Sequence, residues 1–458
     1  MDSAVSAADQ DDPNWRIDDL LANRTTVDPE ENAAIVIGEA LELLPDGWPD
    51  HEPPEMPGWV NPPPTELMMA FDRLADLQPN VRLDEQTESS LRAEVKTFLE
   101  AVVIARTVAD YEMGHHDLWI PPAVIDTLLG ETVEAKTAAQ LLMIDSAVLA
   151  QDGELDGAID SCRGILGVAR SIGDEPFLVS QLMRIAIDGV GINAALRAIG
   201  QGEASDAALE RLQADLFAES LRPLVLYGMK GERAMMVEMI RRIADEEIPI
   251  DHLSGGDSFE YGDPVTPVSP WGRLAFENQL ALALEFLNES VAIARLPAHE
   301  RPERWEAWER WIEEEQAEWH AGWTKTMAIL LTPASRSADL ALRRAEAELG
   351  SMVVLLAAER HRLRHGDWPV SIEAIEDDLL PQMPLDPFSG EAFRLHRPEG
   401  RFVVASIGPN GQDDGGEYEP RVWNRGGPDD VGAIAWDGEL RGQSPPPCES
   451  EQDDGEGI

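Results

Sequence analysis

Residues 182 to 199 read LMRIAIDGVGINAALRAI, and this stretch decides the fold class. Its apolar and small positions alternate in steps of three and four, at Leu182, Ile185, Gly189, Ile192, Leu196 and Ile199. This spacing lines one face of an α-helix. The same spacing recurs earlier in the chain, at Leu91, Val95, Phe98, Val102 and Ala105. The sequence therefore predicts long helices that are packed along their length.

The composition extends this prediction to most of the chain. Hydrophobic residues make up 43% and aromatic residues only 6% of the sequence, while strong helix formers recur throughout. A chain of 458 residues exceeds what one hydrophobic core usually serves. We predict a mainly α fold, an irregular multi-helix array with a small C-terminal α/β module.

The charge excludes several classes of partner. The formal net charge is −51, from 87 acidic and 36 basic side chains. Binding to nucleic acid needs clustered Lys and Arg, and an anionic membrane surface would repel such a chain. We see no signal peptide and no apolar run of membrane-spanning length. We expect a protein partner, no nucleic acid and no membrane span.

Changes in composition divide the chain into segments. We expect a disordered N-terminal tail over 1–25, a helical domain over 26–245 and a linker loop over 246–271. A helical segment with a Trp-rich helix over 272–334 should follow, and then a long helix with a β module over 335–437. The segment 438–458 is predicted to be a disordered acidic tail.

Residues 149 to 159, LAQDGELDGAI, resemble the turn of a tetratricopeptide helical hairpin. Gly153 would form the turn, and the small Ala158 would allow two helices to approach closely. A solenoid of such hairpins needs about three stacked copies. Only one copy is recognisable, which favours a single hairpin within the array.

Five tryptophans lie roughly on one helical face, at Trp305, Trp308, Trp311, Trp319 and Trp323. The alternatives are a membrane-interface or ligand-stacking surface and an ordinary packed face. Many glutamates flank the tryptophans, and acidic flanks oppose binding to lipid headgroups. Packing in a core or a domain interface is therefore favoured.

His361 and His365 are four residues apart, a spacing at which two imidazoles can bind one metal ion. Arg362 and Arg364 lie between them, and two cations are poor neighbours for a metal. Both histidines lie near a predicted helix end before Gly366, where a charged imidazole favours the negative end of the dipole. Structural capping is favoured over a metal site.

Three motifs follow in order: GDWP at 366–369, LPQMPLDPFSG at 380–390 and SIGPNGQDDGG at 406–416. Short β-like runs at 392–396 and 402–406 predict a hairpin between the second and third motifs. Together with the preceding long helix, this order resembles the C-terminal half of the major pseudopilin of type II secretion, over about 335–437. The helical remainder resembles uncharacterised bacterial envelope proteins that carry the same C-terminal pattern.

The pseudopilin resemblance implies a calcium site in the glycine-rich loop. It places Asn410 and Asp430 as ligands, and Asp413 and Asp414 would restore the charge that a neutral amide at 410 removes. A plain acidic turn without metal is the alternative. An EF-hand is rejected because Arg421 stands where a bidentate glutamate is required.

Together these observations predict a non-enzymatic helical interaction or structural protein, in the bacterial envelope by resemblance. The alternative is a hydrolase that uses dispersed carboxylates or the pair His361 and His365. A deep pocket with convergent carboxylates would favour the hydrolase.

Overall fold

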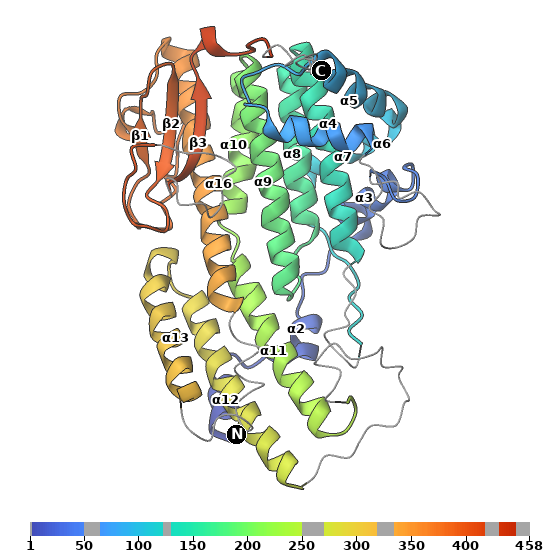
Figure 1. Cartoon of the computed structure of the whole chain (residues 1–458), viewed down its shortest axis with the longest axis vertical. Helices are drawn as coiled ribbons and strands as arrows, with labels where there is room; N and C mark the ends of the chain where they lie inside the picture. Colours follow the sequence, from blue (N-terminus) through green and yellow to red (C-terminus); the bar gives the residue numbers. More distant parts are fainter. Residues whose placement is uncertain are drawn as a thin grey trace, which may run out of the picture.

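The computed structural model describes residues 2–49, 65–121, 130–249, 270–317, 334–416 and 430–445. Within these ranges the chain is mainly helical, with one small sheet near the C-terminus (Figure 1). The helices are α1 (Asp2–Asp11), α2 (Ile17–Ala22), α3 (Ala33–Leu41), α4 (Glu66–Asp76), α5 (Glu85–Thr97), α6 (Leu99–Thr107), α7 (Gly130–Asp152), α8 (Leu155–Ser171), α9 (Leu178–Gln201), α10 (Asp206–Ser220), α11 (Leu224–Ala244), α12 (Pro270–Ala294), α13 (Arg301–Ala317) and α16 (Ala334–His365). Among these helices, none carries an apolar stretch of the length that a membrane span requires.

The central body consists of α7, α8, α9, α10 and α16, which run side by side (Figure 1). Gly153 has a φ of +81° and joins α7 to α8 in a tight turn. Ala158 is fully buried where the two helices meet. The predicted helical hairpin is thus confirmed, whereas its likeness to a tetratricopeptide repeat is not.

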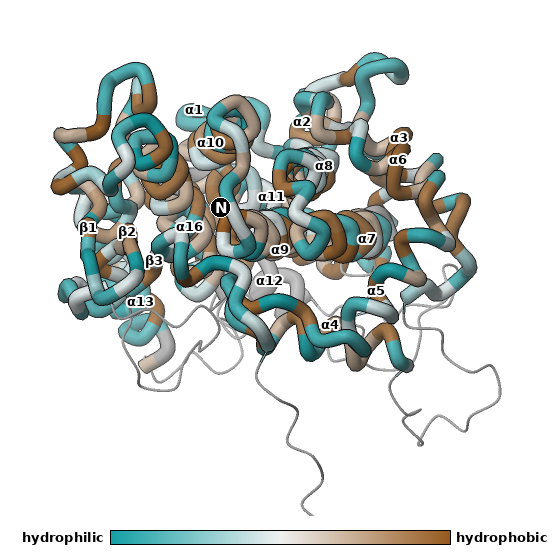
Figure 2. The backbone as a smooth tube through the Cα atoms, turned by 90° about the horizontal axis from the view of Figure 1, so that it is seen from above, coloured by the Kyte–Doolittle hydropathy of each residue, from teal (hydrophilic) through white to brown (hydrophobic). Residues whose placement is uncertain are grey.

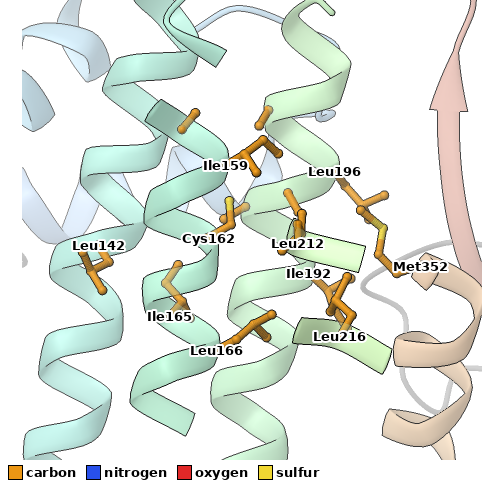
Figure 3. Close-up of a cluster of buried hydrophobic side chains, with 14 of the residues drawn as sticks. Leu142, Ile159, Cys162, Ile165, Leu166, Ile192, Leu196, Leu212, Leu216 and Met352 are labelled. Carbon is orange, nitrogen blue, oxygen red and sulfur yellow. The ribbon is translucent and has the colours of Figure 1, made fainter. Parts of the chain in front are cut away.

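One hydrophobic core joins the helices of the body. Figure 3 shows Cys162 and Leu166 of α8, Leu196 of α9 and Leu212 of α10 gathered in this core, with Met352 of α16 at its edge. The long helix α16 is also part of it, through Leu349, Met352, Val353 and Leu356. The α16 helix is therefore built into the same core as the helices that precede it.

The sheet packs against the C-terminal half of α16 and lies at one edge of the body (Figure 2). Its order is β1 (Arg394–His396), β2 (Arg401–Ser406), β3 (Val431–Trp436), and both pairings are antiparallel. The predicted hairpin corresponds to β1 and β2. Trp368, which follows α16, stacks on Phe402 of β2 with ring centroids 4.5 Å apart.

The N-terminal segment is ordered, so the prediction of a disordered tail over 1–25 is wrong for the described residues. Helix α1 packs on α12, where Ala4 and Ala8 are buried beside Leu284. Asp12 forms ion pairs with Lys230 and Arg233 of α11. The segment looked mobile because its partners lie more than 200 residues away in sequence.

The predicted start of the disordered C-terminal tail, at residue 438, is too early. Residues 438–445 are ordered, and Arg441 is buried against Glu359 of α16. Residues 446–458 lie outside the described part of the chain, as do 250–269 of the predicted linker. The Trp-rich helix corresponds to α13, and its Trp305 and Trp308 are buried in a core, as expected. Trp319 and Trp323 are not among the described residues.

A buried group of charges lies between α9 and α10. The guanidinium of Arg184 donates to both carboxylate oxygens of Glu219, at 2.6 and 2.8 Å. One helical turn on, Asp188 is fully buried, and neither of its oxygens accepts a hydrogen bond from a described residue. Burial raises the pKa of Asp188 well above its usual range, and the nearby Glu219 carboxylate raises it further.

Replacing Asp188 with asparagine is expected to stabilise the protein at neutral pH by about 1 to 3 kcal/mol, because asparagine is neutral at every pH, whereas the buried carboxyl must take up a proton to fold, at about 1.4 kcal/mol for each unit by which its pKa is raised. In the unfolded chain this carboxyl loses its proton near pH 4 (about 3.9), whereas the folded protein retains it to higher pH. Folding therefore takes up a proton in this window, and the stability contributed by Asp188 falls as pH rises. Thermal melts of both proteins should differ at pH 7 and converge near pH 4. The exposed Asp76 gives a matched control, since Asp76→Asn should change the stability at pH 7 by no more than about 0.5 kcal/mol.

Candidate metal centre at the end of helix α16

The last turns of α16 present two histidines on one side. His361 and His365 are four residues apart, and their ring centroids lie 4.5 Å from each other. The helix ends immediately afterwards, because Gly366 adopts a φ of +83° and donates its N–H to the carbonyl of Arg362 at 2.8 Å. This left-handed residue turns the chain back along the helix.

The returning segment brings a carboxylate to the two imidazoles. Trp368, Ile372 and Ile375 are buried in the main core and fix its path. Glu376 follows directly, and its Oε2 lies 2.8 Å from Nδ1 of His361. Its Oε1 contacts Nε2 of His365. Both carboxylate oxygens are thus directed at imidazole nitrogens.

His361, His365 and Glu376 are the one group of its kind in the described chain, with ligand atoms within 4.8 Å of one another. Hydrogen bonds from His365 and then His361 lower the pKa of Glu376 to about 2. Glu376 is therefore a carboxylate at neutral pH. Two imidazole nitrogens and one carboxylate oxygen are a ligand set that zinc and related divalent ions accept.

The two arginines that opposed a metal site in the sequence are occupied elsewhere. Arg362 pairs with Glu359 and Glu203, and its guanidinium lies over the Trp368 ring. The Nη1 of Arg364 lies 2.7 Å from a carboxylate oxygen of Asp378. Each cation thus has its own acidic partner, which removes the main objection to a metal ion at the histidines.

Sequence reasoning found the histidine pair and missed Glu376. No local pattern marks this glutamate, since it lies 15 residues after His361 and meets it only through the chain reversal at Gly366. An acidic residue on the segment that returns along a helix end is the one signal that could have pointed to it.

The residues of the predicted calcium loop lie at the end of the sheet where β2 finishes and β3 begins. Asp430 precedes β3 and accepts hydrogen bonds from the backbone N–H groups of Asp414 and Gly416, at 3.1 to 3.2 Å. Asn410 donates its side-chain amide to Asp414 at 3.0 Å. Asp413 Oδ1 lies 3.1 Å from Nε2 of His396.

In this arrangement the acidic side chains of the loop are occupied mainly by the loop's own donors. Burial raises the pKa of Asp430, against the lowering effect of the backbone N–H bonds that it accepts. Asp413, Asp414 and Asp430 are in one loop system, but they do not form a group of three ligand atoms within 4.8 Å in the described residues. Residues 417–429 lie outside those residues. Calcium binding by this loop stays a prediction.

Comparisons with known proteins add no identification: no protein-family model matches the chain, and no curated protein and no solved structure is significantly similar to it.

Proposed function

We propose that this chain is a non-enzymatic helical binding protein that holds a divalent transition metal ion, of the zinc class, through His361, His365 and Glu376. The observation that carries the proposal is the convergence of their ligand atoms within 4.8 Å. The ion would join the end of α16 to the chain 15 residues further on. It would thus fasten the returning segment, and the sheet behind it, to the helical body.

Two features support a binding role over the hydrolase alternative. A three-ligand zinc site leaves one position open, as catalytic sites do, but hydrolysis also needs a cleft that holds the substrate beside the metal. The neighbouring cavity of 370 Å³ is lined by Arg360, Asp378 and other residues, and by none of the three candidate ligands. The side chain of His365 is also about half exposed. Location in the bacterial envelope and a protein partner stay part of the proposal, on the resemblance alone.

Zinc binding, measured by isothermal titration calorimetry, tests the proposal. The protein is expected to bind one zinc ion per chain at this site. The variants Glu376→Gln and His361→Ala should each weaken binding at least tenfold, because each removes one of three ligands. His299→Ala is a matched control, since this half-exposed histidine lies beside Glu300 on a different segment. Equal affinity in all four proteins would refute the metal site.

The same titration with calcium separates the two candidate sites. Calcium prefers oxygen ligands, so the binding of calcium should not depend on His361. Binding that is lost in Asp430→Asn and retained in His361→Ala would assign calcium to the loop at 408–416. Binding that neither variant changes would reflect only the general acidity of the surface.

A further inference from the structure

A second site lies between α4, α7 and α9. Two views place α4 across one side of the α7 and α9 pair (Figures 1 and 2), and a cavity of 580 Å³ lies between the three helices. This volume is in the range of pockets that take small organic ligands, roughly 300 to 1,000 Å³. None of the candidate metal ligands lines it, so the two sites are independent.

The walls of the cavity are two parallel apolar stripes. On α7 the lining positions include Ala139, Met143 and Ala147, and on α9 they include Met183, Ile187 and Val190. Steps of three and four keep each set on one helix face. Phe71 and Leu74 of α4 close the third side. The interior therefore suits a hydrocarbon group.

The lining of the cavity includes two cationic side chains and one carboxylate, in a chain that is otherwise strongly acidic. Lys136 is one of four lysines in the sequence. It lines the cavity from an exposed position on α7, and no ion pair joins it to any other described residue. Arg197 lines the α9 wall and donates to the carbonyl of Val81 at 2.9 Å. Asp72 of α4 is the one acidic side chain in the lining, so cations outnumber it within this pocket.

We propose that this cavity binds a small amphipathic anion, a medium-chain carboxylate, with its headgroup at Lys136 and its hydrocarbon chain between Met143, Ile187 and Val190. The apolar walls exclude a compact, fully polar anion, because its remaining polar groups would lose water without gaining partners. A lining with two cationic side chains and one carboxylate, inside a chain of charge −51, is the complement of a single carboxylate. An amphipathic partner helix, about 10 Å across, fits less well, because α4 already closes one side of the cavity.

Dodecanoate, below its micelle concentration, is the probe, and calorimetry of the full chain is the measurement. The unaltered protein should bind one dodecanoate per chain. Ala186→Phe should weaken binding at least tenfold, because this exposed alanine lines the cavity and a phenyl ring there would occupy it. Ala207→Phe, at an exposed position on α10, is the matched control and should bind normally.

The headgroup is tested separately. Lys136→Gln should weaken dodecanoate binding at least fivefold and leave dodecanol binding unchanged, whereas Lys96→Gln on α5 should change neither. The absence of saturable dodecanoate binding, or equal binding in Ala186→Phe, would overturn the proposal. So would saturable binding of a short acidic amphipathic helical peptide without dodecanoate binding, since that would make the site a docking surface for a protein. If Lys136→Gln weakened the binding of dodecanoate and of dodecanol equally, Lys136 would not recognise a carboxylate, and that part of the proposal would be overturned.

Discussion

Replacing Leu356 with aspartate is expected to unfold the helical body as a whole. Leu356 is fully buried in the core that α16 shares with α7, α8, α9 and α10. A buried charge without a partner costs several kcal/mol, about 3 to 5 when measured by breaking buried pairs. That loss is a large part of the roughly 5 to 15 kcal/mol that stabilises an ordinary domain. The apolar pattern of α16 alone predicts unfolding only of the C-terminal half of the chain. The core that α16 shares with α7, α8, α9 and α10 extends the expected unfolding to the whole helical body.

Circular dichroism during thermal unfolding measures this effect. Leu356→Asp should show either no cooperative transition or one shifted down by many degrees. Val370→Asp is the control, because Val370 is 94% exposed just beyond the same helix and should change stability by no more than about 0.5 kcal/mol. An unshifted transition in Leu356→Asp would show that the core drawn around α16 is wrong.

The second large effect is expected from Arg441→Ala. The guanidinium of Arg441 donates to both oxygens of Glu359 at 2.8 and 2.9 Å, and both side chains are almost fully buried. It also donates to the carbonyls of Gly202 and Trp436, at 2.8 and 2.9 Å. One side chain thus joins the end of α9, the C-terminal part of α16 and the end of β3.

Removing Arg441 leaves Glu359 with fewer partners in a buried position. Burial by itself raises the pKa of Glu359, but its bonds to Arg362 and Arg441 together hold the pKa below its usual range. Breaking a buried pair on one side typically costs about 3 to 5 kcal/mol. Urea unfolding should show this loss for Arg441→Ala. For Arg394→Ala the loss of stability should be less than about 1 kcal/mol, because its partner Glu391, which precedes β1, is exposed. A loss in Arg441→Ala as small as that of the control would mean that residues 438–445 contribute little to the fold.

Periodicity in the sequence was sufficient to predict the elements whose burial follows their own pattern. The first half of α16 is a clear case, because Ala338, Leu342, Ala345 and Leu349 are buried in steps of three and four, whereas residues 349–360 are buried on every side of the helix. The hairpin of β1 and β2 is another, since two short β-like runs and the Pro-x-Gly turn between them are local signals. The burial of Trp305 and Trp308 also followed from local composition, through the acidic residues around them.

Elements held by distant partners could not be predicted in this way. The α1 helix has few apolar residues, and it is fixed by charges on α11 and by Leu284 of α12. The candidate metal centre likewise has one part that the sequence predicts and one part that it does not. The spacing of His361 and His365 is visible in the sequence, but Glu376 joins them only because buried side chains set the course of the returning chain.

The contacts of residues 440–443 have a consequence for how the protein is made. Asn80 donates its side-chain amide to the carbonyl of Leu440, 360 residues later, and Gly442 donates to the carbonyl of Gly200. The loop that follows α4 and the end of α9 therefore gain these partners only after the ribosome has synthesised residue 443. Until then, the earlier helices emerge with part of their surface uncovered, and large sequence separations between contacts slow folding. Chaperones that shield exposed helices during synthesis should accordingly raise the yield of folded protein more than those that act only after release.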